Sequence, residues 1–246
     1  MPSGIGGRMT WNPMVKTENR FASTKMTTGR PVPKPTHVVC HITGTSSFAK
    51  AKKTFLNEVS PHYLVDQNGV IYQFVEEENQ AWHAGIKTGV QALYNASPSH
   101  WRRYLYCFDW YAYPAGSVFL DAHLHSVDGK DGADFVRRSD SSDWPDYDYF
   151  NARWGSAAGP VNYEMSKRPN AYSVGIEILS VGSKNASESK YSGAMYNSLR
   201  RLVADICDRN SIPMKKGTVV GHEDVNPMQR WGWDPNQGFN WNKVWE

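Results

Sequence analysis

The segment Gln67-Asn68-Gly69 lies between two short apolar runs, at residues 62–66 and 70–74, and it limits the folds open to this chain. An Asn-Gly pair adopts the tight turn that connects neighbouring antiparallel strands. The pattern therefore predicts a β-hairpin. Any sheet built around these residues must contain an antiparallel pair of strands.

Further apolar segments alternate between strand-like and helix-like spacing. The strand-like segments are short and rich in β-branched residues, and they are residues 36–41, 172–179 and 218–220. Residues 48–59 and 191–206 carry apolar side chains at helical spacing, and residues 44–47 offer an N-cap to the first of these helices. The second helix is expected to end near Asn210. We expect an α/β fold with a central mixed β-sheet flanked by helices.

The length of 246 residues suits one large domain with additions. Residues 1–35 are rich in Gly, Pro, Thr and Lys and predict an irregular N-terminal arm, laid over the domain or partly loose. Residues 36–246 are expected to form a single domain, with a long aromatic-rich insertion at about 86–170 that sustains neither period. The insertion's aromatic rings could widen a sugar-binding groove or build a small subsidiary core, and for most of them we favour the subsidiary core. Its His123 and His125 are expected to be surface or structural residues.

Composition narrows the possible partners. The net charge is +3 and no dense Lys/Arg block occurs, so we expect no nucleic-acid partner. No apolar run approaches the ~18 residues of a membrane span, and the N-terminus lacks the apolar stretch of a secretory signal. We expect a protein made in the cytoplasm without a signal peptide. The cysteines at 40, 107 and 207 are odd in number and irregularly spaced, which predicts reduced, mostly buried thiols.

Two histidines stand at the ends of predicted strands. His41 ends the strand at 36–41 and His222 follows the strand at 218–220, so both are expected at a common mouth of the sheet. Asp234 comes twelve positions after His222. Two imidazoles and one carboxylate can hold a catalytic zinc with its fourth position open. The alternatives are histidines that only cap strands and an Asp-Pro pair that only opens a turn. Spacing alone leaves these possibilities open.

The order of motifs resembles the zinc amidase family that includes N-acetylmuramoyl-L-alanine amidases, short phage lysins and peptidoglycan recognition proteins. The resemblance is carried by VVCHITGTSS around His41, SPHYLVDQNGVIYQFVEEENQAWHAG at 60–85, NAYSVGIEIL at 170–179 and GHEDVNPMQRWGWDPNQGFNW at 221–241. It covers about half of the chain. The AWHAG segment and the GHEDVNP and WDP pieces are its most specific parts.

The resemblance implies one Zn²⁺ ion held by His41, His222 and Asp234, with Glu177 as the catalytic acid–base group. It implies hydrolysis of the amide bond between N-acetylmuramic acid and the L-alanine of the stem peptide in bacterial peptidoglycan. Zinc would acidify a water and polarise the carbonyl, while Glu177 would carry a proton to the leaving nitrogen. Glu177 lies inside an apolar run, where a purely structural carboxylate would need a partner.

Four further residues are candidates for substrate binding: His83, His62, Trp82 and Arg230. His83, in AWHAG, either lines the substrate groove or braces its loop, and His62 either supports the site from behind or belongs to the core. Many family members carry an oxyanion-stabilising lysine two residues before the third ligand, where this chain has Gly232. Arg230 or His62 could supply that donor, or no residue does.

Two biological settings and one non-enzymatic role are compatible with such a chain. A phage endolysin, released from the cytoplasm by a holin and lysing the cell through its wall, is the setting we favour. An interbacterial amidase toxin, delivered to a rival's periplasm and matched by an immunity protein, is the alternative. A non-catalytic peptidoglycan-binding module is the rival from another functional class, and Asp234 in its Trp-Asp-Pro setting argues against it.

Overall fold

The fold was analysed in a computed structural model that describes residues 11–85, 169–181, 190–225, 230, 234–236 and 238–245. The helices and strands of these residues are η1 (Thr17–Asn19), β1 (Met26–Thr27), β2 (His37–Ile42), α1 (Phe48–Asn57), β3 (Tyr63–Val65), β4 (Ile71–Gln73), β5 (Gln80–Ala81), α7 (Pro169–Tyr172), β6 (Ser173–Ile178), α8 (Gly193–Asn210), β7 (Val219–Gly221), α9 (His222–Val225) and α11 (Asn242–Trp245). Most of the predicted insertion, including His123 and His125, lies outside these residues.

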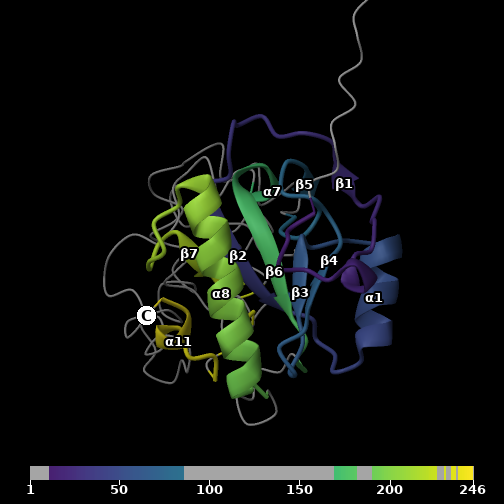
Figure 1. The fold of residues 1–246 in the computed structure, drawn as a ribbon, viewed down its shortest axis with the longest axis vertical. Helices are drawn as coiled ribbons and strands as arrows, with labels where there is room; N and C mark the ends of the chain where they lie inside the picture. Colours follow the sequence, from purple (N-terminus) through teal and green to yellow (C-terminus); the bar gives the residue numbers. More distant parts are fainter. Residues whose placement is uncertain are drawn as a thin grey trace, which may run out of the picture.

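A five-stranded sheet in the order β4-β3-β6-β2-β7 forms the centre of the molecule (Figure 1). The strands β3, β6, β2 and β7 run parallel to one another, and the edge strand β4 runs antiparallel to β3. The turn between β3 and β4 contains Gly69 at a φ of +79°, the left-handed conformation that glycine adopts without a steric penalty. The predicted mixed α/β sheet and its hairpin are therefore confirmed.

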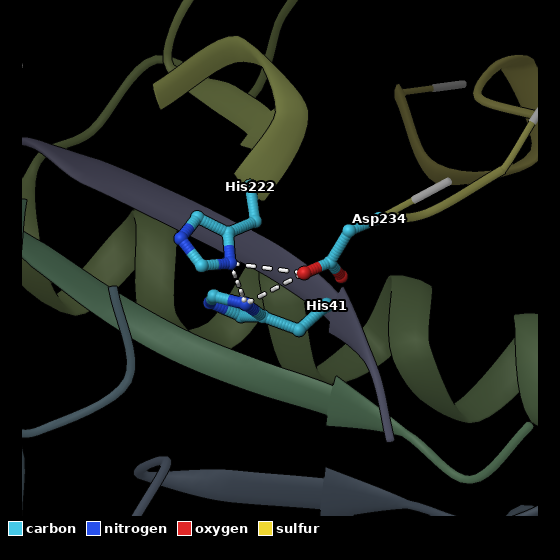
Figure 2. Close-up of side chains that lie close together, drawn as sticks. All are labelled: His41, His222 and Asp234. Atoms are coloured by element: carbon cyan, nitrogen blue, oxygen red, sulfur yellow. Dashed lines mark hydrogen bonds and ion pairs between the residues drawn. The ribbon is translucent and has the colours of Figure 1, made fainter. Parts of the chain in front are cut away.

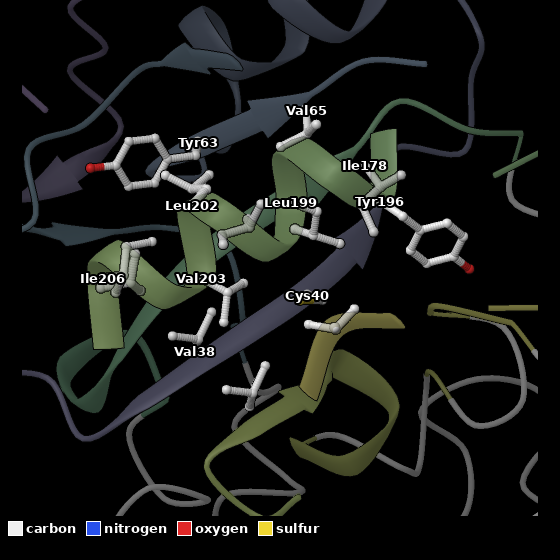
Figure 3. Packing of buried hydrophobic residues seen from close by; sticks show 14 of the residues in the cluster. Val38, Cys40, Tyr63, Val65, Ile178, Tyr196, Leu199, Leu202, Val203 and Ile206 are labelled. Carbon is white, nitrogen blue, oxygen red and sulfur yellow. The ribbon is translucent and has the colours of Figure 1, made fainter. Parts of the chain in front are cut away.

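The long helix α8 covers one face of this sheet (Figure 3). Its apolar side chains recur every three to four residues and pack on alternate residues of the strands. The cluster includes Leu199, Leu202, Val203 and Ile206 from the helix and Val38, Cys40, Tyr63, Val65 and Ile178 from the sheet. The other face is covered at β3 and β4 by α1, whose Ala51 and Phe55 pack against Leu64 and Phe74. Helices thus flank the sheet on both faces.

The ends of the two predicted helices follow from their capping residues. The Ser47 hydroxyl accepts a hydrogen bond from the Lys50 N–H at the start of α1, and Ser192 does the same for Met195 at the start of α8. α8 ends at Asn210, as its sequence period predicts, and Ser211 follows in a left-handed conformation. Cys40 and Cys207 are buried, as expected, while Cys107 lies outside the described residues.

Residues 11–35 lie along the domain. The strand β1 pairs with β5, and a bridge joins Arg20 to Gln73 of β4. The Arg30 side chain donates to the carbonyl oxygens of Glu77 at 2.6 Å and of Asn170 and Ala171 at 3.1 Å. This segment thereby connects the loop after β4 to α7, next to the site described below. The boundaries of arm, domain and insertion stay predictions.

Candidate metal centre and catalytic site

Strand alternation places His41 and Glu177 on the face of the sheet opposite α8. Cys40 and Ile42, which flank His41, both belong to the cluster beneath α8, and so does Ile176, which precedes Glu177. Because successive side chains of a strand point to opposite faces, His41 and Glu177 point the other way. The two are register partners across the parallel pair β2–β6. Their side chains therefore emerge next to each other.

His222 and Asp234 reach this same edge from the C-terminal segment. His222 is the first residue of α9 and directly follows β7. The Asp234 carboxylate accepts from the Ile42 N–H at 2.8 Å through Oδ1 and contacts His222 Nδ1 at 2.9 Å through Oδ2. The Glu223 N–H also donates to the Asp234 carbonyl at 3.0 Å. The backbones of β2 and α9 thus fix the position of Asp234.

The three side chains point toward one another (Figure 2). His41 Nδ1 lies 3.0 Å from His222 Nδ1 and 3.8 Å from Asp234 Oδ2, and the exposed fractions of the three residues are between 1% and 3%. Zinc–nitrogen bonds of about 2.0–2.1 Å in a tetrahedral site separate neighbouring ligand atoms by about 3.3 Å. The observed spacing and the donor types therefore fit a metal ion. Among the described residues, this group is the one in which three His, Cys, Asp or Glu ligand atoms lie close enough together to hold a metal ion.

The electrostatics of the cluster favour metal-binding protonation states. Burial lowers the pKa of His222 to about 4, so its imidazole is neutral at pH 7. Burial by itself would raise the pKa of the Asp234 carboxyl, but the contacts with His222 and His41 hold that pKa well below its usual range. A neutral imidazole and an ionised carboxylate both offer lone pairs to a cation.

Glu177 stands beside this cluster without a hydrogen-bond partner for its buried Oε2 atom. The pKa of Glu177 is raised to about 7, chiefly by burial, with His41 opposing the shift and the nearby Asp234 carboxylate adding to it. A carboxyl group with a pKa near neutrality can both accept and release a proton at physiological pH. Among the described residues, none hydrogen-bonds to Oε2, as a purely structural role for this carboxylate would require.

A cavity of about 520 Å³ opens onto these side chains. Its lining includes seven of the predicted site residues, which are His41, Trp82, His83, Glu177, His222, Arg230 and Asp234. One wall is apolar, since Val59 and Trp82 are 46% and 42% exposed, and the Trp82 indole N–H donates to the Thr27 hydroxyl at 3.1 Å. Acidic, basic and apolar groups thus meet in one cavity beside the candidate metal centre.

The eighth predicted residue, His62, lies behind the cavity, with its ring centroid 5.6 Å from that of His83. It has no exposed surface and does not line the cavity. Its Nδ1 accepts from the Gly175 N–H at 2.9 Å, and its Nε2 lies 3.1 Å from the Asn79 carbonyl oxygen and 2.8 Å from Arg30 Nη2. Burial and the neighbouring Arg30 charge lower the pKa of His62 well below its ordinary value. His62 is thus a core residue whose ring packs behind that of His83, with no surface open to a substrate.

Two residues around the site were not singled out from sequence. The Asn170 side chain lines the cavity and accepts from the backbone N–H groups of His83 and Ala84 at 3.3 and 2.8 Å. Nothing in the sequence marks it. Gly175 leaves space for the His83 ring, and a glycine inside an apolar strand is a signal of such close approach. Gly232 lies outside the described residues.

A buried cluster of two histidines and an aspartate, with a carboxyl group of raised pKa beside it in a cavity, has the composition of a mononuclear metal-hydrolase site. The sequence model of the N-acetylmuramoyl-L-alanine amidase family (Amidase_2) matches residues 30–237, most of the chain. The chain therefore belongs to this amidase family, and the prediction of an amidase that acts on peptidoglycan is confirmed. No curated protein sequence matches the chain.

Solved structures provide a further comparison. A selenomethionine derivative of AmpD is 18% identical, with a TM-score of 0.48 over 96% of both chains. Escherichia coli AmiD, solved with anhydro-N-acetylmuramic acid-L-Ala-D-γ-Glu-L-Lys, is 24% identical, with a TM-score of 0.45 over 87% of this chain and 58% of AmiD. Pseudomonas aeruginosa AmpDh3, solved with an anhydromuramic pentapeptide, is 18% identical, with a TM-score of 0.43 over 87% of this chain and 60% of AmpDh3. The chain thus spans about 60% of the length of the latter two.

No helix among the described residues combines the length and the apolar character that crossing a membrane requires.

Proposed function

We propose that the chain is a zinc-dependent amidase that hydrolyses the bond between N-acetylmuramic acid and L-alanine, with His41, His222 and Asp234 as the zinc ligands. The observation that carries the proposal is the convergence of three buried ligand atoms within 4.8 Å of one another, beside Glu177. Zinc, when bound, supplies Lewis-acid chemistry, because it polarises a carbonyl and makes a water more acidic. Membership of the amidase family supports the choice of substrate.

Glu177 is the proton carrier in this proposal. Its buried, unpartnered Oε2 takes the proton of the attacking water and later delivers it to the alanine nitrogen as the amide bond breaks. The carboxyl group begins and ends the cycle ionised. Its raised pKa suits both steps, since a group with a pKa of about 7 can both take up and release a proton at neutral pH.

Three further lining residues, Trp82, Val59 and Arg230, bind and orient the muropeptide. Trp82 and Val59 supply an apolar wall on which a sugar ring or an alanine methyl group can pack. Arg230 is 36% exposed, with its Nε 3.8 Å from Asp234 Oδ2, so it stands where a negatively charged carbonyl oxygen would need a donor. We assign it the oxyanion role that Gly232 leaves open.

Mass spectrometry of purified peptidoglycan after incubation with the protein tests the proposal. We expect free stem peptides with new alanine N-termini. This product should disappear with a chelator, return with zinc, and be absent with His41→Ala and Glu177→Ala. Intact glycopeptides under all conditions would contradict an amidase, and new reducing sugar ends would indicate a glycosidase instead.

The same test separates the enzyme from a non-catalytic peptidoglycan-binding module. Both would sediment with cell-wall sacculi, but only the enzyme would release peptides from them. Glu177, whose carboxyl group lines the cavity without a partner for Oε2, favours the enzyme, because binding alone gives no reason to bury an unsatisfied carboxylate.

We further propose that the protein acts on the cell wall in the periplasm as a phage endolysin, with an interbacterial toxin as the alternative. The proposed substrate, peptidoglycan, supports action on the cell wall, and both roles share this substrate. The neighbouring genes distinguish them, since a holin gene accompanies an endolysin and an immunity gene accompanies a toxin. Lysis of a host on co-expression with a holin would test the first role directly.

A further inference from the structure

His83 connects the candidate metal centre to the start of α7 through hydrogen bonds. Its Nδ1 lies 2.9 Å from His41 Nε2, and its Nε2 lies 3.2 Å from the Ser173 hydroxyl. The Ser173 hydroxyl in turn donates to the Pro169 carbonyl oxygen at 2.6 Å. The contacts form one continuous series from His41 through His83 and Ser173 to Pro169.

This series has a single possible direction. The Pro169 carbonyl can only accept, so the Ser173 hydroxyl must donate its one proton to this oxygen. Ser173 then accepts from the His83 Nε2–H. A neutral imidazole carries one N–H, which leaves His83 Nδ1 as an acceptor facing His41 Nε2. His41 must therefore carry its proton on Nε2, and its Nδ1 keeps a lone pair.

The opposite side of the His41 ring requires the same tautomer. The Asp234 carboxylate only accepts, so the contact of 2.9 Å from His222 Nδ1 to Asp234 Oδ2 places a proton on that nitrogen in the metal-free protein. His41 Nδ1 lies 3.0 Å from this N–H group, which has no lone pair to offer, so His41 Nδ1 cannot donate to it and faces it with a lone pair. Both ends of the His41 ring thus agree on an Nε2–H imidazole with a free Nδ1 lone pair.

The His83 ring is itself held in place by its surroundings. A Cβ atom at Gly175 would lie 2.4 Å from His83 Cγ, so the ring packs directly on the backbone of β6. Asn170 fixes the loop that carries the ring, because it accepts from the N–H groups of His83 and Ala84. The ring therefore cannot rotate freely away from His41.

We propose that His83 is a positioning residue that, with Ser173 behind it, holds His41 as the Nε2–H tautomer and directs the Nδ1 lone pair at the metal. The inference rests on the proposed metal site but not on the reaction performed there. Partners that orient metal-binding histidines typically contribute about 10–100-fold to metal affinity. His83 thereby acts through His41 and does not need to touch the substrate.

The first test is the zinc dissociation constant, measured by competition with a colorimetric chelator. His83→Leu, which keeps the bulk but not the hydrogen bonds, should weaken zinc binding about 10–100-fold. His83→Gln, whose amide can accept from His41 and donate to Ser173, should recover much of that loss. Ser173→Ala should weaken zinc binding in the same direction, to a smaller extent.

Ser23→Ala is a matched control for Ser173→Ala. Ser23 is also buried, and its hydroxyl also donates to a backbone carbonyl oxygen, that of Phe55, at 2.7 Å. The two variants remove the same kind of bond, so they should lose similar stability. Only Ser173→Ala should change zinc affinity, whereas equal effects of the two variants on zinc affinity would overturn the proposal.

The second test reads the tautomer directly, in the metal-free protein, from the ¹⁵N chemical shifts of the His41 ring. We expect a protonated Nε2 and an unprotonated Nδ1 in the unsubstituted protein, and a mixture of tautomers in His83→Leu. A proton on Nδ1 in the unsubstituted protein, or an unchanged tautomer in His83→Leu, would overturn the proposal. Because this readout needs neither zinc nor substrate, an absence of amidase activity would count against the proposed function alone.

Discussion

His41 and Glu177 are register partners on the adjacent parallel strands β2 and β6, and both point away from the helix α8. This relationship puts a candidate metal ligand and a candidate proton carrier next to each other on rigid backbone. Two strands supported by a packed core hold such a pair more accurately than loops do. The chemistry of the site therefore depends on the pairing register, because a slip of one residue would send Glu177 into the core.

The first prediction concerns Glu177→Gln, which keeps the shape of the side chain but cannot carry a proton. We expect amide hydrolysis to fall about 10²–10⁴-fold, the usual contribution of general acid–base catalysis. Zinc binding should stay close to that of the unsubstituted protein, since Glu177 is not among the proposed ligands. Peptide release measured beside zinc stoichiometry checks both statements. Undiminished hydrolysis would remove Glu177 from the mechanism.

The second prediction concerns Gly175→Ala. The added Cβ would lie 2.4 Å from His83 Cγ, which is too close for the ring to stay where it is. We expect a loss of about 1–3 kcal/mol in the free energy of unfolding, as is usual for overpacking, together with weaker zinc binding. Urea denaturation and chelator competition measure the two effects. Gly193→Ala, where an added Cβ atom would meet no other atom within 4 Å, is a suitable comparison for the same change without a clash.

The third prediction concerns Trp82, whose indole forms part of the exposed cavity wall. Trp82→Ala should raise KM for a soluble muropeptide by about tenfold or more, because stacking on an aromatic ring contributes about 0.5–1.5 kcal/mol beyond its burial of apolar area. Trp82→Phe should retain much of the affinity. Thr27→Val removes only the hydrogen bond to the indole and should have a smaller effect. An unchanged KM in Trp82→Ala would place the substrate elsewhere in the cavity.

The fourth prediction concerns the pH dependence of stability in the zinc-free protein. Burial lowers the pKa values of His62, His83 and His222 in the folded state. Below a pH of about 6.5, the ordinary pKa of histidine, these residues therefore bind more protons in the unfolded chain than in the folded one. Their contribution to the free energy of unfolding is present above that pH and is lost as the pH falls toward 4. Glu177 has the opposite sign, since its raised pKa stabilises the folded state below about 4.5 and this gain is lost as the pH rises through 7.

Three histidines outweigh one glutamate, so the net change between pH 7 and pH 5 should be destabilising. Each fully titrating group contributes about 1.4 kcal/mol per pH unit. Urea midpoints of the chelator-treated protein at the two pH values measure this difference. Equal midpoints, or a higher midpoint at pH 5, would show that the buried imidazoles become protonated without unfolding.

The sequence by itself determined the main strands and helices of this protein and the candidate residues of its site. Period and turn chemistry predicted the hairpin at Asn68-Gly69 and the helix that ends at Asn210, because these signals are local and the structure does not override them. Strand ends and ordered motifs singled out His41, His222, Asp234 and Glu177, and family membership agrees with the motifs.

Only the tertiary structure decided how these residues meet. Sequence spacing predicts the hairpin but carries no information on which parallel strands pair. The pairing of His41 with Glu177 and the burial of His62 therefore follow from the strand order β3-β6-β2 and its register. The hydrogen bonds from His41 through His83 to Pro169 join segments far apart along the chain. Such contacts arise from packing of the whole domain, and no local pattern encodes them.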